Sequence, residues 1–99
     1  MGHGYVGTLS VDLHLPEGRS LKTKRKELLR VKTGLARRFA CAVAEVDHHD
    51  LWQRCGLAMA CTAREVGALH GLLDDAERWL HGQEWDVVRI DRRIVSLED

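Results

Sequence analysis

Apolar and polar side chains alternate along the first part of the chain, over residues 5–15. Leu9, Val11 and Leu13 fall on one side of this segment, and small or polar side chains separate them. A period of two residues is that of a β-strand with one buried face. The Pro-Glu-Gly stretch at 16–18 ends the predicted strand, because proline and glycine interrupt regular structure.

The period changes to that of a helix over residues 21–39. Leu28, Val31 and Leu35 lie within one narrow stripe at about 100° per residue, and the opposite side is largely basic. Ser20 is well placed to cap the N-terminus of this helix. The pattern predicts an amphipathic helix with a basic outer face.

Two short strands are expected next, at residues 40–47 and 51–61. The first is rich in alanine and valine, and in the second Cys55 and Leu57 alternate with smaller or polar residues. The polar stretch Asp-His-His-Asp at 47–50 separates the two strands as a turn.

A second helix and a final strand complete the pattern. Thr62 followed by Glu65 has the spacing of a capping box, which predicts that the helix begins at this point. Apolar residues then recur at helical spacing up to a glycine. The last strand is expected over residues 85–97, with Val88 and Ile90 directed toward the core.

The order strand, helix, strand, strand, helix, strand is the split βαβ arrangement of ferredoxin-like folds. We therefore expect an α+β protein in which two helices cover one face of a four-stranded antiparallel sheet. The two crossovers place the strands at 5–15 and 51–61 in the centre of the sheet.

Composition agrees with one small globular domain. The chain has 99 residues, of which 44% are hydrophobic and 30% charged, so we expect a single core and one domain over residues 1–99. No apolar run is long enough to cross a bilayer and the N-terminus lacks the features of a signal peptide, which predicts a cytoplasmic protein without a membrane partner.

Cys41, Cys55 and Cys61 form no Cys-x-x-Cys pair; we interpret them as buried free thiols, and a disulfide between Cys41 and Cys55 stays open.

Charge is unevenly distributed although the net charge is zero. Residues 19–38 hold nine basic side chains against Glu27 alone, a net charge of +8, so the rest of the chain carries −8. A segment of this kind presents a local positive potential that attracts a phosphate backbone.

The basic side of the first helix is therefore the candidate nucleic-acid-binding surface. Successive cations on it can follow a phosphate backbone, a contact that is independent of base sequence and sensitive to salt. The candidate residues are Lys22, Arg25, Lys26, Arg30, Arg37 and Arg38. A solvated basic surface without a ligand is the alternative interpretation.

The uncovered face of the sheet is a poor candidate for stacking bases. RNA-recognition motifs stack bases on aromatic side chains of the two central strands, whereas the outward positions expected here are small or polar, with only Trp52 at one end. We expect a lattice of surface ion pairs on this face instead. Its expected members are Arg54, Arg89 and Arg93 with Asp12, Glu45 and Asp91.

Lys24 lies on the flank of the apolar stripe of the first helix, and four cations crowd the first turn, where the helix dipole disfavours them, so we expect compensating charges nearby. The predicted topology brings the strand and turn that contain Glu45, Asp47 and Asp50 to the same end of the sheet as Lys24 and Arg25. We favour a partly buried ion-pair cluster there, and the alternative is that the lysine stem packs while its amine reaches water.

The Asp-His-His-Asp stretch superficially resembles the signature of a phosphoesterase family. Adjacent residues rarely converge on one metal ion, and the chain holds no further cluster of ligands and no arrangement of nucleophile and base. We therefore expect no metal, no cofactor, no small-molecule substrate and no enzymatic activity. A metal-dependent hydrolase at Asp47, His48, His49 and Asp50 is the minor alternative.

Two stretches resemble the bacterial YlxP-like family, a domain of unknown function. They are Ser-Leu-Lys-Thr-Lys-Arg at 20–25, followed by Leu28 and Lys32, and Ala-Glu-Val-Asp-His-His-Asp-Leu-Trp-Gln-Arg at 44–54. The resemblance implies a ferredoxin-like domain. It also implies a role in ribosome maturation or translation, because genes of the family commonly lie beside those of translation initiation factor two and ribosome-binding factor A. The matching positions are Lys22, Lys24, Arg25, Glu45, Asp47, Asp50, Trp52, Gln53 and Arg54, and all of them except Lys22 form a candidate ion-pair or partner site.

Two functional hypotheses follow from the sequence. The first is a non-enzymatic module that binds ribosomal or other structured RNA through the basic helix. The second is a protein-interaction module or homodimer, in which the basic helix meets the acidic remainder of another copy or an acidic partner.

Overall fold

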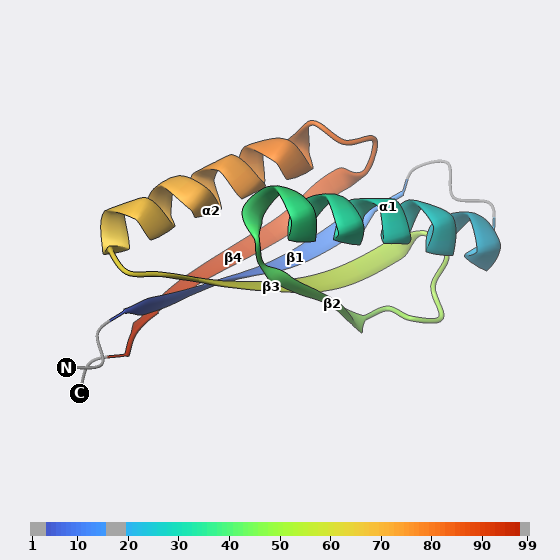
Figure 1. Ribbon diagram of the computed structural model, residues 1–99. Helices are drawn as coiled ribbons and strands as arrows, with labels where there is room; N and C mark the ends of the chain where they lie inside the picture. Colours follow the sequence, from blue (N-terminus) through green and yellow to red (C-terminus); the bar gives the residue numbers. More distant parts are fainter. Residues whose placement is uncertain (1–3, 16–19, 98–99) are drawn as a thin grey trace.

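The computed structural model describes residues 4–15 and 20–97. Six elements follow one another along the chain: β1 (Tyr5–His14), α1 (Leu21–Phe39), β2 (Ala42–Asp47), β3 (Arg54–Ala63), α2 (Val66–His81) and β4 (Asp86–Ser96). All neighbouring strands are antiparallel and lie in the order β2-β3-β1-β4. Both helices cover the same face of the sheet (Figure 1). The ferredoxin-like α+β fold is thereby confirmed, with β1 and β3 in the centre of the sheet.

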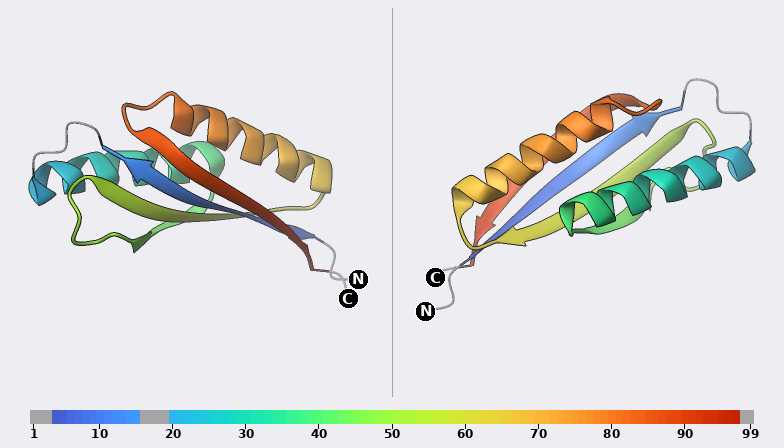
Figure 2. Two further views of the ribbon diagram at one scale, coloured as in Figure 1. Left: turned by 180° about the vertical axis from the view of Figure 1, so that it is seen from behind. Right: turned by 45° about the horizontal axis from the view of Figure 1, so that its top comes forward.

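The core lies between the sheet and the two helices. Alternate side chains of the central strands, such as Leu9 and Leu57, are about as buried as Leu35 of α1 and Leu69 of α2, with 0–1% of their surface exposed. The intervening side chains of β1 and β3 lie on the other face, which carries no helix when it is seen from behind (Figure 2). Burial of apolar area on one face of each element is the main stabilising contribution in a domain of this kind.

α1 begins and ends as its sequence predicts. The backbone N–H of Thr23 donates to the Ser20 hydroxyl at 3.1 Å, which satisfies one of the unpaired donors of the first turn. At the other end Ala40 takes a left-handed conformation, with φ at 50°, and this turns the chain into β2. The strand therefore starts at Ala42 rather than at residue 40.

The predicted start of the second helix is wrong. Thr62 does not cap a helix, because it pairs with Val6 in the sheet and β3 continues to Ala63. α2 begins only at Val66, and Glu65 precedes it in an extended conformation without a side-chain capping bond. Pairing with a neighbouring strand therefore overrides the local capping signal.

The predicted inward orientation of Val88 is also wrong. Asp12 pairs with Arg89 and Leu13 with Val87, so Val88 is the extra residue of a β-bulge between β1 and β4. Its side chain is 54% exposed, whereas Ile90 packs against the core as expected. A single inserted residue of this kind produces no periodic pattern in the sequence, so the sequence does not predict the bulge.

All three cysteines are free thiols; Cys55 and Cys61 are buried, and Cys41 is partly exposed. Neither α1 nor α2 is sufficiently long and apolar to span a lipid bilayer, and no other helix is found in the described ranges 4–15 and 20–97.

Candidate functional site

Six exposed cations lie on α1, four of them on the side that points away from the sheet, with Arg25 and Arg38 adjoining these four. Leu28, Val31 and Leu35 pack into the core, so the residues on the opposite side of the helix face solvent. These cations, hereafter the basic face, are Lys22, Arg25, Lys26, Arg30, Arg37 and Arg38, and all six are exposed. Because the first and last of these cations stand near the two ends of α1, which has 19 residues, the basic face extends along most of the length of this helix.

Only part of the basic face is engaged by other side chains. Arg30 forms an ion pair with Glu27 at 2.9 Å and donates to the side-chain oxygen of Gln83 at 2.9 Å. The guanidinium of Arg38 stacks 5.5 Å from the ring centre of Trp79 and keeps its charge. The other four cations of the basic face have no carboxylate within ion-pair distance among residues 4–15 and 20–97.

A shallow groove of about 530 Å³ runs along the basic face. Its lining consists of Lys26, Leu29, Arg30, Thr33, Gly34, Arg37 and Arg38. Leu29 is 65% exposed among these cations, and it is not one of the candidate residues named from the sequence. Its helical phase predicts this exposure, because a residue directly after the buried Leu28 is turned away from the core.

Lys24 lies at the opposite side of α1 and is buried. Only 1% of its surface is exposed, and its ammonium lies 3.2 Å from a carboxylate oxygen of Glu45 on β2. The same ammonium donates a hydrogen bond to the backbone carbonyl of His48. A buried cation is stable only when it is paired and hydrogen-bonded in this way, so Lys24 joins α1 to the end of β2.

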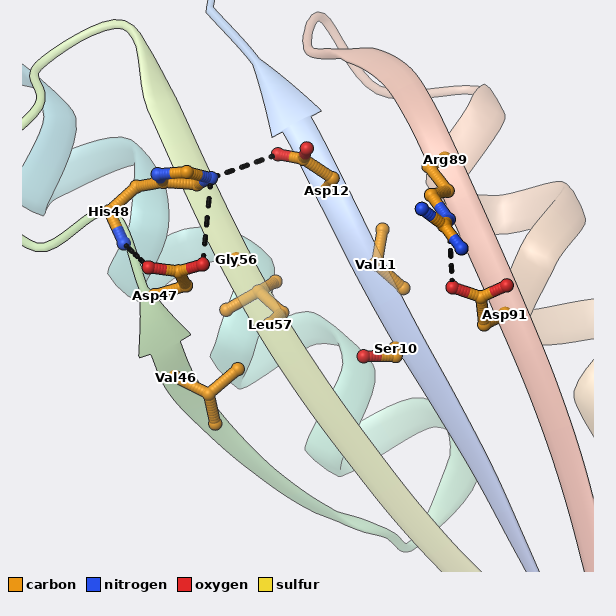
Figure 3. Close-up of a pocket in the computed structure, with 10 residues that line it drawn as sticks. All are labelled: Ser10, Val11, Asp12, Val46, Asp47, His48, Gly56, Leu57, Arg89 and Asp91. Atoms are coloured by element: carbon orange, nitrogen blue, oxygen red, sulfur yellow. Dashed lines mark hydrogen bonds and ion pairs between the residues drawn. The ribbon is translucent and has the colours of Figure 1, made fainter.

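His48 holds the turn after β2 in an unusual conformation. Its φ of 60° lies in the left-handed region, and its backbone N–H donates to a carboxylate oxygen of Asp47 at 2.8 Å. Its imidazole Nε2 lies 3.7 Å from Asp12 and 3.8 Å from Asp47 (Figure 3). Asp12 also accepts a hydrogen bond from the guanidinium of Arg54, so the turn is tied to both central strands.

These side chains border a hollow of about 360 Å³ on the uncovered face of the sheet. Asp12, Asp47 and Asp91 reach it from three different strands (Figure 3). Each carboxylate already has a partner beside it, since Arg89 lies 2.9 Å from Asp91, Arg54 pairs with Asp12, and the His48 imidazole faces Asp12 and Asp47. In the described part of the chain no three histidine, cysteine or acidic side chains are arranged to hold a metal ion. The hollow is therefore a surface of mutually paired polar side chains.

Cys55 lies under this region and is an unreactive thiol. Burial, and secondarily the nearby charge of Glu45, raise the pKa of Cys55 to about 12. The thiolate is the reactive form of cysteine, so Cys55 does not supply a nucleophile near neutral pH.

The family model for DUF503, described as a protein of unknown function, matches residues 6–94. The chain belongs to the DUF503 family. YlxP-like is the known name of this family, so the resemblance of the two sequence stretches is confirmed. Among curated proteins, the sequence has no significant match.

The two stretches of this DUF503 domain that resemble the family meet in space. Lys24 comes from the first, and Glu45 and His48 from the second, and the buried ion pair joins them. Asp47 and Asp50 form no ion pair with Lys24 or Arg25 in the described residues, and Arg25 is exposed on the basic face.

The remaining motif residues of the DUF503 domain lie around the turn between β2 and β3. Trp52 and Gln53 are exposed, and the backbone oxygen of Gln53 accepts a hydrogen bond from Leu15. Arg54 pairs with Asp12 as expected. Glu45 departs from the expected surface lattice, because its partner is Lys24 rather than an arginine of the sheet.

Proposed function

We propose that this DUF503 domain is a non-enzymatic, cytoplasmic RNA-binding protein that assists ribosome maturation or translation. In this proposal the basic face of α1 binds the phosphate backbone of ribosomal or another structured RNA. The single observation that carries it is that Lys22, Arg25, Lys26 and Arg37 are exposed and have no carboxylate partner within the described chain. Release of counterions from the RNA would then drive binding.

The dimensions of the basic face suit a phosphate backbone. Lys22 and Arg37 are fifteen positions apart in one helix, which is about 22 Å at 1.5 Å per residue. This length spans several consecutive phosphates. Along β1 and β3 the one aromatic side chain is Tyr5, which packs against the core on the helix-covered face. The uncovered face of these two strands therefore offers no aromatic side chain, and the proposed contact reads charge and shape rather than bases.

Charge reversal on the basic face tests the proposal. We expect wild-type protein to bind a labelled ribosomal RNA hairpin in fluorescence anisotropy, with affinity falling steeply between about 50 and 200 mM salt. K26E/R37E should weaken binding about tenfold or more and reduce the salt slope by about two, because two phosphate contacts are lost. The loss should be similar for hairpins of unrelated sequence.

A matched variant separates the basic face from net charge alone. R64E/R89E changes the total charge by the same amount, and both arginines are exposed outside the basic face. This control should retain wild-type affinity within about threefold. Equal losses for both double variants, or no binding of RNA by the wild type, would contradict the proposal.

The competing protein-interaction hypothesis makes a different prediction for the same variant. If the basic face meets an acidic surface of another copy, K26E/R37E should abolish self-association that weakens with salt. Light scattering on the wild type and on this variant, in the absence of RNA, distinguishes the two hypotheses.

A further inference from the structure

The two edges of the sheet differ in how well they are protected from pairing. β2 has only six residues and a register shift between Glu45 and Asp47, and short, bulged strands resist edge pairing. β4 has eleven residues, contains neither proline nor glycine, and is regular beyond the bulge at Val88. Within the described ranges β4 pairs only with β1. A long regular edge is a template for another strand.

The direction of the peptide groups of β4 follows from one hydrogen bond. The N–H of Leu97 donates to the carbonyl of Gly4 beside β1 at 2.9 Å. Peptide groups alternate in direction along a strand, so the odd-numbered residues from Arg89 onward point toward β1. Ile90, Arg92 and Ile94 therefore direct their N–H and C=O groups toward the open edge.

We propose that β4 pairs antiparallel with β4 of a second copy of this chain, about a two-fold axis at Arg92. The pairing joins the two four-stranded sheets into one continuous sheet. Each of the outward peptide groups of Ile90, Arg92 and Ile94 then finds a partner, and Ile90 of one copy lies opposite Ile94 of the other. An isologous interface of this type closes with two copies and does not propagate.

Charge selects this register among its neighbours. With the axis at Arg92, Asp91 faces Arg93 of the other copy, and the pair occurs twice by symmetry. Arg93 is exposed and has no ion-pair partner in the part of the chain that the structure describes. An axis at Asp91 would place Asp91 opposite itself and Arg89 opposite Arg93, and like charges directly opposite are destabilising.

The position of the bulge and the ion-pair partners of Arg92 both favour an axis at Arg92. A register centred on Ile90 would draw the bulged Val88 into the pairing, whereas the register centred on Arg92 uses only the regular part of β4. The two Arg92 side chains meet at the axis, but each guanidinium is already held by carboxylates of α2. It lies 2.6 Å from Glu77 and 2.9 Å from Asp74.

A charge swap tests the register as well as the dimer. In analytical ultracentrifugation from about 5 to 200 µM, the wild type should dimerise, and D91R or R93D alone should raise the dissociation constant about tenfold. D91R/R93D restores opposite charges across the axis and should return the constant to within about threefold of the wild type. Both residues are exposed on the sheet, and circular dichroism of each variant checks that the fold is retained.

Hydrogen exchange supplies an independent readout of the same pairing. The amides of Ile90, Arg92 and Ile94 should become protected as the protein concentration rises, while those of Asp91 and Arg93 stay protected throughout by β1. A wild type that is monomeric over the whole range, or a swap that does not restore dimerisation, overturns the proposal. So does loss of the dimer in K26E/R37E, because that result places the interface on α1.

Discussion

The side chain of Lys24 joins a helix, a strand and a turn. Its ammonium is buried beside Glu45 and the carbonyl of His48. Replacing it with methionine preserves the approximate length of the side chain but leaves a largely buried carboxylate and a carbonyl without their cation. We expect K24M to lower the free energy of unfolding by about 3 kcal/mol, near the lower end for a broken buried pair because Glu45 retains some contact with water.

Urea denaturation measures this loss, and two variants show that the pair causes it. K22M changes an exposed lysine of the same helix turn and should alter stability by no more than about 0.5 kcal/mol. K24M/E45L removes both charges and should be more stable than K24M. A K24M protein as stable as K22M would mean that the ion pair contributes nothing to the fold.

Cys55 makes stability depend on pH in the alkaline range. Burial first, and the charge of Glu45 second, raise its pKa from 9.0 to about 12 in the folded state. The buried thiol makes its full contribution to the free energy of unfolding below about pH 9. This contribution is lost as the pH rises toward 12, because the thiol ionises at lower pH in the unfolded state than in the folded state. At about pH 10.5 the loss should reach about 2 kcal/mol, at 1.36 kcal/mol per pH unit.

The difference between wild type and C55A isolates this thiol from other groups that titrate at high pH. We expect the stability advantage of the wild type over C55A in urea denaturation to shrink between about pH 9 and 10.5. An advantage that is constant with pH would show that Cys55 ionises equally in the folded and unfolded states.

At the scale of elements, the contact between α1 and α2 depends on a glycine. A Cβ atom at Gly34 would lie 2.6 Å from the ring of Trp79 on α2, so the two helices approach closely only because no side chain stands there. Alanine favours a helix over glycine by about 1 kcal/mol. We expect G34A nevertheless to destabilise the protein by about 1 kcal/mol, because overpacking displaces the indole.

Gly71 provides the matched control in the other helix. A Cβ there meets no atom within 4 Å, so G71A should stabilise the protein by about 0.5–1 kcal/mol through helix propensity alone. Thermal unfolding ranks the variants, and tryptophan fluorescence reports the displacement of Trp79 in G34A. Equal stabilisation by both alanines would show that the ring moves aside at no cost.

At the scale of the whole molecule, the two proposed surfaces lie on different parts of the fold. α1 packs beside β2 and α2 lies over the β1 side of the sheet, whereas β4 is at the opposite edge from β2 (Figure 1). Pairing at the β4 edge therefore leaves the basic face of α1 exposed in both copies. RNA binding and dimerisation can be tested separately for this reason, because K26E/R37E leaves β4 unchanged, and D91R and R93D leave α1 unchanged.

The sequence by itself determined the order of the elements, the family and the basic face of α1. The order of the elements and the basic face depend on residues close together in the chain, because a period of two or of 3.6 residues decides which side chains share a face. The family follows from the two motifs at 20–25 and 44–54. The expectation that Lys24 needs compensation also came from nearby residues, through its helical phase and its place among the cations of the first turn.

Only the tertiary structure decided which distant residues meet. It selected Glu45 and the carbonyl of His48 as the partners of Lys24, placed the bulge at Val88, and extended β3 past a local capping signal at Thr62. Each of these depends on pairing between segments far apart in the chain, where the free energy of burial and of strand hydrogen bonds exceeds local propensity.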